Sequence, residues 1–220
     1  MMPEKKNEEA NEDWISTYSD MVTLLLTFFI MLLAASKVDA VLFEQIKNGI
    51  SKEWYNKDVE QPLASLRADL SDDLASVSTD ADLALGKDQS GLTLEIPAKA
   101  FFKVGSAELL PKAKTILMKI LSTLKAPRYN MFRFEVQGHS DDQRIKTSQY
   151  PSNWELSAAR AAAVVRFFES NGIPSPRLKA TGMADVQPKY PNRDAYGQPI
   201  PINQERNRRV VIRMEPSFLP

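Results

Sequence analysis

The spacing of hydrophobic residues changes several times along this chain, and each spacing predicts a different element. Residues 14–35 (WISTYSDMVTLLLTFFIMLLAA) are apolar almost throughout and contain one charged residue, Asp20. A helix of that length extends ~33 Å, which matches a hydrocarbon core of ~30 Å. We therefore expect a transmembrane helix over residues 14–36, after a polar tail at residues 1–13 that we expect to be disordered.

A cleaved signal peptide is the competing interpretation of the apolar stretch. Met21–Ala35 has the length of a signal-peptide core, and Ala34-Ala35-Ser36 supplies small residues for cleavage. However, the preceding segment is long and net acidic, whereas a signal peptide begins with a short positive one. Trp14 and Tyr18 at the N-terminal edge are typical of an interfacial aromatic belt. The membrane anchor is the interpretation that we favour.

After the apolar stretch, the pattern becomes amphipathic and then acidic. Val38–Trp54 places its apolar residues at helical spacing, which predicts an amphipathic helix leaving the membrane, and we assign residues 37–58 to this segment. Residues 60–90 hold seven acidic and two basic side chains. We therefore assign residues 59–90 to a solvated linker, which could contain a short helix at Pro62–Leu74.

From Gly91 onward, the pattern predicts a packed α+β domain, which we assign to residues 91–220. One helix is expected from Pro111 to Ala126-Pro127, and a longer one over Asn153–Asn171, with Asn153 as its N-cap. Alternation of apolar and polar residues predicts four strands. They are expected at Gly91–Ile96, Phe132–Val136, Leu178–Gly182 and Val210–Met214.

Charge and rare residue types exclude several classes of function. Lys+Arg and Asp+Glu number 28 each, and a net charge of zero argues against a nucleic-acid-binding protein. The absence of cysteine excludes disulfides and thiolate metal sites, and the single histidine, His139, excludes a His-rich metal site. His139 is followed by no well-placed nucleophile, and the neighbouring side chains of Asp141 and Asp142 diverge. We expect neither an enzyme nor a bound metal nor an organic cofactor.

Asp20 is a charged residue that the apolar stretch cannot leave outside the membrane, because Met21–Ala35 alone is too short to span it comfortably. A carboxylate near mid-bilayer costs ~2.5–3.5 kcal/mol and needs a proton or a partner. Hydroxyl side chains share its helix face and form a polar stripe: Ser16, Thr17, Thr23 and Thr27. This stripe indicates an ion path that requires a partner with several helices. The alternative is that Asp20 only marks the interface, with the hydroxyls bonded to the backbone.

A second group of polar residues follows the predicted strand Phe132–Val136. Gly138-His-Ser-Asp141 comes directly after that strand, and Asn153 and Arg160 lie on one face of the next helix. A carboxylate beside a guanidinium suits a zwitterionic ligand, because Asp141 can bind an ammonium group and Arg160 a carboxylate. The alternative is a structural salt bridge between Asp141 and Arg160.

Both groups lie in stretches that resemble a known family. The stretch from Trp14 through Tyr18-Ser-Asp20 to Phe28-Phe29 resembles the transmembrane signature of MotB/PomB-type flagellar motor stator subunits. Three further motifs resemble the OmpA-like peptidoglycan-binding domain that those subunits carry: Gly138-His-Ser-Asp141, Asn153-Trp-Glu-Leu-Ser-Ala-Ala-Arg160 and Asn207-Arg-Arg-Val210. Ser140 stands where the family more usually has threonine, and it keeps the hydroxyl group.

The resemblance implies a βαβαβ-type domain with a mixed sheet, anchored in the bacterial inner membrane with a cytoplasmic N-terminus and a periplasmic C-terminal domain. It implies a homodimer surrounded by a MotA/PomA-type multi-helix subunit, with residues 37–58 acting as a plug. Asp20 would carry the coupling ion, H⁺ or Na⁺, with Thr23 and Thr27 supporting its path. The diaminopimelate of a peptidoglycan stem peptide would bind a pocket formed by Asp141 and Arg160, with Asn153, Arg208 and Ser140 beside them.

Two other functions remain open at this stage. One is a peptidoglycan-anchoring envelope protein with no ion role, against which the polar stripe beside Asp20 argues. The other is a stator-like subunit of a non-flagellar ion-driven machine, which a single chain does not distinguish from a flagellar one.

Overall fold

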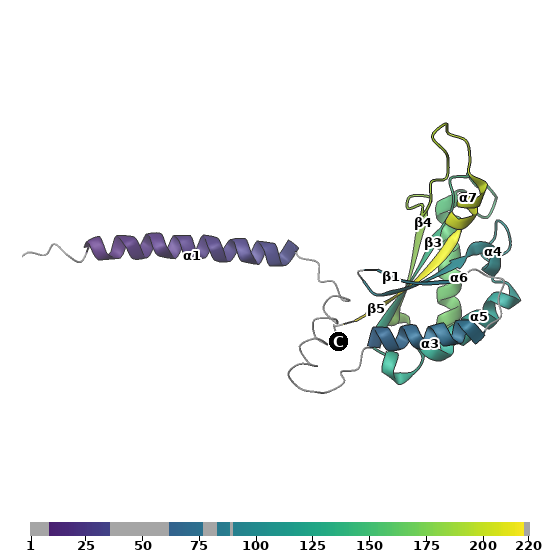
Figure 1. Ribbon diagram of the computed structural model, residues 1–220, viewed down its shortest axis with the longest axis horizontal. Helices are drawn as coiled ribbons and strands as arrows, with labels where there is room; N and C mark the ends of the chain where they lie inside the picture. The colour runs from purple at the N-terminus through teal and green to yellow at the C-terminus, as the bar shows by residue number, and fades with distance from the viewer. Residues whose placement is uncertain (1–8, 36–61, 77–82, 89, 218–220) are drawn as a thin grey trace, which may run out of the picture. The chain divides into compact units, whose positions relative to one another are not determined.

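The computed structural model describes residues 9–35, 62–76, 83–88 and 90–217 (Figure 1). The chain divides into two units, one containing a single long helix and the other an α+β domain, and each is described by itself. The plug segment expected at residues 37–58 lies outside the described residues.

Helix α1 (Glu9–Ala35) is the first unit. Its stretch Trp14–Ala34 is long and apolar enough to cross a membrane, and each side chain in that stretch is exposed. Exposure of so many apolar side chains is expected where lipid or a partner surrounds the helix. The helix begins at Glu9, so the end of the tail predicted to be disordered is helical.

The second unit is built on a five-stranded mixed sheet with the order β1-β2-β5-β3-β4. Its strands are β1 (Ala84–Lys87), β2 (Leu92–Pro97), β3 (Phe132–His139), β4 (Leu178–Ala184) and β5 (Arg209–Pro216). The β3–β4 pair is parallel and the other pairs are antiparallel. The four strands that the alternation predicted are all present. The expected α+β class with a mixed sheet is confirmed.

Three helices cover one face of this sheet, and their buried side chains join those of the strands in a single core. They are α3 (Pro62–Ser76), α5 (Pro111–Leu124) and α6 (Asn153–Ser170). Helix α5 begins at Pro111 as predicted, because the first turn of a helix needs no N–H donor there. Short elements complete the unit: α4 (Ala98–Phe101), η1 (Pro127–Tyr129), η2 (Ser175–Arg177) and α7 (Pro201–Asn207).

Helix α3 lies within residues 59–90, which the sequence pattern assigned to a solvated linker. Leu66 and Leu70 are wholly buried in the core, and α3 runs beside α5 (Figure 1). The Tyr129 hydroxyl donates to the Asp69 carboxylate at 2.6 Å, and burial together with this carboxylate raises the pKa of Tyr129 to about 12. The short helix that the sequence allowed at Pro62–Leu74 is present and extends to Ser76. It packs into the core, so the assignment of residues 59–90 to a solvated linker is wrong for α3, and also for β1. The acidic residues of α3, which are Asp69, Asp72 and Asp73, masked the leucines that hold this helix in the core.

We expect Leu66→Ala to lower the free energy of unfolding by about 2–5 kcal/mol, because removing a wholly buried leucine side chain leaves a cavity. Arg67→Ala, at an exposed position of the same helix, is the matched control and should change stability little. Thermal unfolding of the full-length chain in detergent measures both variants. Equal melting temperatures for the two would show that α3 does not belong to the core.

Candidate functional site

The candidate site forms where α6 packs closely on β3 and β4. A Cβ atom at Gly138 would lie 2.1 Å from the Ser157 carbonyl oxygen, and one at Gly182 would lie 2.8 Å from the Ala158 Cβ. Only glycine permits this approach without movement of the helix. The Ser157 hydroxyl also accepts a hydrogen bond from the Ala184 amide at 3.1 Å. These contacts hold the N-terminal half of α6 against the loop that follows β3.

Asp141 lies on that loop, directly after β3, as the sequence predicted. The Ser140 amide donates to the Ala184 carbonyl at 2.8 Å, which ties the start of the loop to the end of β4. The Asp141 carboxylate lies 2.5 Å from Nη1 of Arg208. The Asp141 side chain is 6% exposed and that of Arg208 is 39% exposed, so Arg208 forms the solvent side of the ion pair.

Arg160 is held beside this pair from the middle of α6. Its Nε donates to the Ser106 carbonyl at 2.9 Å, and its guanidinium lies 5.4 Å from the centre of the Phe102 ring. Burial lowers the pKa of Arg160, the charge of Arg208 lowers it further, and Tyr150 and Asp141 act in the opposite direction. Arg160 is therefore a cation with little solvent around it.

The structure thus brings together Asp141, Arg160 and Arg208, three of the predicted site residues. Asp141 pairs with Arg208, and within the described ranges no carboxylate forms an ion pair with Arg160. The salt bridge between Asp141 and Arg160 that the sequence left open is not formed. The cluster contains two guanidiniums and one carboxylate, which leaves one positive charge for an anionic group to balance.

Asn153 orients the loop rather than capping α6. Its amide nitrogen donates to the carbonyls of Asp141 and Gln143, at 3.1 and 2.9 Å, and its oxygen accepts from the Ile145 amide at 3.3 Å. The N-cap is Ser152, whose hydroxyl accepts from the Trp154 amide while Glu155 accepts from the Ser152 amide. The predicted N-cap was therefore wrong by one residue. Ser152 was the better candidate, because a glutamate three residues later completes a capping box.

Two buried amides on α7 fix the neighbouring loops. The sequence named Asn207 only as part of the Asn207-Arg-Arg-Val210 motif, without a role, and it did not single out Gln204. The Gln204 side chain donates to Asp142 at 2.8 Å and accepts from Gln143 at 3.1 Å. Asn207, wholly buried, accepts from the amides of Lys189 and Tyr190 at 2.9 and 3.0 Å. Phe102 and Ser106, which position Arg160, were missed as well. The contacts of these residues reach far along the chain, so no local pattern marks them.

Asp142 belongs to the structural framework of the site. Its carboxylate lies 2.6 Å from Nε of Arg193 and also accepts the hydrogen bond from Gln204. Burial acts to raise the pKa of Asp142, but hydrogen bonds from Gln204 and Arg193 outweigh it and hold that pKa below its ordinary value. Asp142 is thus paired within the fold, whereas Asp141 faces the two guanidiniums.

A cleft of about 650 Å³ adjoins the site on the side of Asn153. The loop between β3 and α6 forms one wall of this cleft with Arg144 and Lys146, and Trp154 of α6, 52% exposed, forms another. The cleft shares Asp142 and Asn153 with the framework of the site. It supplies room beside the charged cluster for a ligand larger than a single amino acid.

The polar stripe of α1 is present in the described residues, with its hydroxyl donors bonded along the helix. Thr23 donates to the Asp20 carbonyl at 2.9 Å, and Thr27 donates to the Thr23 carbonyl at 2.5 Å. A hydroxyl oxygen that donates in this way keeps lone pairs with which it can accept a hydrogen bond or coordinate a cation. The backbone bonding that the sequence left as an alternative is therefore observed, and it leaves the oxygens of Thr23 and Thr27 usable.

His139 is the last residue of β3 and is 3% exposed. Neither of its ring nitrogens has a hydrogen-bond partner within the described ranges. Burial, together with the charges of Arg209 and Arg213, lowers the pKa of His139 to about 4. The imidazole is therefore neutral at pH 7.

Comparison with known proteins shows two family models along the chain. The model of the OmpA family matches residues 101–200, and the model described as membrane MotB of the proton-channel complex MotA/MotB matches residues 2–53. The uncharacterized protein YtxE of Bacillus subtilis is 32% identical, over 94% of this chain and 90% of its own length. Motility protein B of the same organism is 24% identical, over 96% and 93%.

A solved structure extends these similarities to the fold. The cell wall anchor of the T6SS from Pseudomonas aeruginosa aligns with a TM-score of 0.56 and 30% identity, covering 72% of this chain and 99% of that one. The OmpA model and this alignment confirm that the α+β unit has the expected OmpA-like fold.

The buried imidazole of His139 predicts a pH dependence of stability. Its folded-state pKa of about 4 lies below the ordinary value of 6.5, so protons bind the unfolded chain preferentially. Stability should therefore fall as the pH drops below 6.5, by about 2 kcal/mol on reaching about pH 5. The free energy of unfolding, measured by urea unfolding at pH values above 6.5 and at about pH 5, gives the size of this change. His139→Gln, which cannot be protonated, should remove most of it, and an unchanged pH dependence in that variant would contradict the assignment.

Proposed function

This chain belongs to the MotB family of stator subunits, and from that membership we propose that it anchors an ion-driven membrane complex to peptidoglycan. The observation that carries the proposal is the charged cluster of the α+β domain, in which Arg160 lies beside the Asp141–Arg208 pair and forms no ion pair with a carboxylate of the described residues. The α+β domain supplies the anchor in the periplasm. Helix α1 spans the inner membrane, with the N-terminus in the cytoplasm.

The cluster fits the diaminopimelate of a stem peptide, whose free end carries an ammonium group and a carboxylate on one carbon. Asp141 binds the ammonium group, and Arg160 and Arg208 bind the carboxylate. Arg160 is already fixed by Ser106 and Phe102, so little side-chain freedom is lost on binding. Asn153 acts by holding the loop that carries Asp141. The cleft beside Asn153 leaves room for the rest of the wall polymer.

The second half of the proposal is that Asp20 carries the coupling ion through a path completed by a MotA/PomA-type multi-helix subunit. A carboxylate in the span Trp14–Ala34 requires polar surroundings, and the exposed face of α1 provides them only in part. The oxygens of Thr23 and Thr27 extend the polar surface along the helix. The ion is H⁺ or Na⁺, and two copies of the chain pair within the surrounding subunit.

A second candidate function is anchoring without ion transport. It is favoured by the similarity of the α+β domain to the T6SS cell wall anchor, which covers nearly all of that chain. Both functions use the same wall site, so the variants of Asp20 described below separate them.

We expect Asp141→Ala and Arg160→Ala each to weaken binding to peptidoglycan by roughly ten-fold or more, because a charge-assisted hydrogen bond contributes about 1.5–3 kcal/mol. Sedimentation of the full-length chain with purified sacculi measures the binding, and a melting curve for each variant shows whether it folds. Asp72→Ala and Arg166→Ala remove the same charges at exposed positions of the domain and are the matched controls. If a folded Asp141→Ala or Arg160→Ala variant still binds peptidoglycan fully, the cluster supports the fold and does not bind the wall.

Asp20→Asn should abolish ion-driven work while the chain still assembles, because the amide keeps the size of the side chain but cannot carry a proton or a negative charge. Asp20→Glu should retain part of the activity. Torque or swimming in a strain that depends on this chain, measured with and without sodium, tests the role and identifies the ion. If Asp20→Asn still supports rotation, anchoring without ion transport is the better account.

A further inference from the structure

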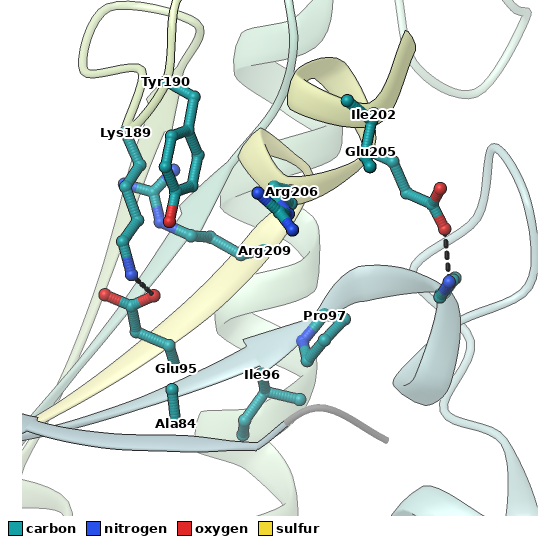
Figure 2. Close-up of a pocket in the computed structure, with 11 residues that line it drawn as sticks. Ala84, Glu95, Ile96, Pro97, Lys189, Tyr190, Ile202, Glu205, Arg206 and Arg209 are labelled. Atoms are coloured by element: carbon teal, nitrogen blue, oxygen red, sulfur yellow. Dashed lines mark hydrogen bonds and ion pairs between the residues drawn. The ribbon is translucent and has the colours of Figure 1, made fainter. Parts of the chain in front are cut away.

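A second charged cleft lies beside α7, away from the Asp141 site. It has a volume of about 540 Å³, and we refer to it as the α7 cleft. Figure 2 shows its charged and aromatic side chains, which come from β2, α4, the loop before α7, α7 itself and the start of β5. Arg208 and Arg209 are consecutive residues, but Arg208 pairs with Asp141 whereas Arg209 lines the α7 cleft.

The charges that line the α7 cleft are only partly balanced. Lys189 lies 2.5 Å from Glu95, and Lys99 pairs with Glu205. Within the described parts of the chain, neither Arg206 nor Arg209 forms an ion pair with a carboxylate. The lining therefore carries two positive charges in excess, and both are guanidiniums.

These two guanidiniums lie near the ring of Tyr190. Arg206 is 5.4 Å from the centre of that ring, and the ammonium group of Lys189 is 5.9 Å from it. In Figure 2, the Tyr190 ring lies between Lys189 and Arg206, with Arg209 passing beneath it. The cleft thus gathers N–H donors and a phenol hydroxyl around one opening.

Arg209 is incompletely satisfied by the fold. Its Nη1 and Nη2 donate to the carbonyls of Asn207 and Gln187 over long distances of 3.3 Å, and its buried Nε has no acceptor among the described residues. Burial lowers the pKa of Arg209, while Glu95 and Tyr190 act in the opposite direction. A half-buried cation with an unused, buried N–H donor is stabilised by an anion that accepts from it.

We propose that the α7 cleft binds a phosphate group, held between Arg206 and Arg209 with the Tyr190 hydroxyl as a further donor. A carboxylate carries a single negative charge, whereas a phosphate carries up to two and offers more acceptor oxygens to two guanidiniums. The excess of two positive charges matches that demand. Phosphate of this kind occurs in anionic polymers of cell walls and in anionic lipid headgroups. The site is separate from the Asp141 cluster and would add a second point of attachment for the domain.

In the first test, the full-length chain in detergent is titrated with inorganic phosphate, and its melting temperature is measured at each concentration. Chloride at equal ionic strength is the reference. We expect a saturable rise with phosphate that is weakened at least ten-fold by Arg206→Gln. Arg206 is exposed on α7, so this variant should fold. Arg166→Gln, exposed on α6, is the matched control and should behave as the original chain. An equal response of Arg206→Gln and Arg166→Gln, or of phosphate and chloride, would overturn the proposal.

Two further arms identify the source of the phosphate. In one, sacculi with their phosphate polymers intact are compared with sacculi from which these polymers have been removed by hydrofluoric acid. In the other, the chain is placed in nanodiscs of phosphatidylcholine with and without phosphatidylglycerol. If intact sacculi retain more of the chain than stripped sacculi, and Arg206→Gln removes that gain, the phosphate belongs to a wall polymer. If phosphatidylglycerol raises the melting temperature, and Arg206→Gln removes that rise, the phosphate belongs to a lipid. If Arg206→Gln changes neither the retention by sacculi nor the response to phosphatidylglycerol, the α7 cleft binds neither a wall polymer nor a lipid through its phosphate.

These measurements also separate the α7 cleft from the wall site. Arg206→Gln should leave binding to polymer-free sacculi unchanged, whereas Asp141→Ala should weaken it and leave the response to inorganic phosphate unchanged. Failure of the Asp141 prediction would count against the proposed wall site alone. Failure of the Arg206 prediction would count against the α7 cleft alone.

Discussion

The close approach of α6 to β3 and β4 is the constraint on which the domain depends. It requires glycine at positions 138 and 182, where any side chain would meet the backbone of α6 or the Ala158 side chain. Because α6 lies so near the sheet, Arg160 and Asn153 reach the loop that follows β3. The charged cluster with Asp141 is therefore a consequence of backbone packing. A larger residue at Gly138 would push α6 away from β3. It would thereby move Arg160 away from Asp141 without changing any charged side chain.

The junction of α7 and β5 divides the surface chemistry of the domain. Two consecutive arginines diverge there, so that Arg208 serves the Asp141 cluster and Arg209 the α7 cleft. Gln204 and Asn207 make this possible, because their buried amides hold α7 against the loops on either side. Satisfied buried amides of this kind fix one arrangement of the backbone. A short helix with few apolar residues can in this way position two charged sites.

The core begins earlier in the chain than its hydrophobic pattern indicates. Leu66 and Leu70 bring α3 onto α5, and Asp69 secures the contact through Tyr129. The domain that would bear load against the wall therefore includes α3. The stretch from residue 36 to residue 61 separates α1 from α3. The attachment of α3 rests on Leu66 and Leu70, on the partly buried Leu63 and Leu74, and on a few polar contacts.

The sequence by itself determined the elements whose cause is local. Alternation placed the central strands, Pro111 began α5, and the length of the apolar run around Asp20 predicted a helix able to cross a membrane. The sequence also predicted that Asp141, at the end of a strand, and Arg160, in the helix that follows, would lie together. Only the tertiary structure decided that Asp141 pairs with Arg208, that Ser106 and Phe102 hold Arg160, and that α3 joins the core. Those outcomes depend on contacts between residues far apart in sequence, where spacing carries no information about distance in space.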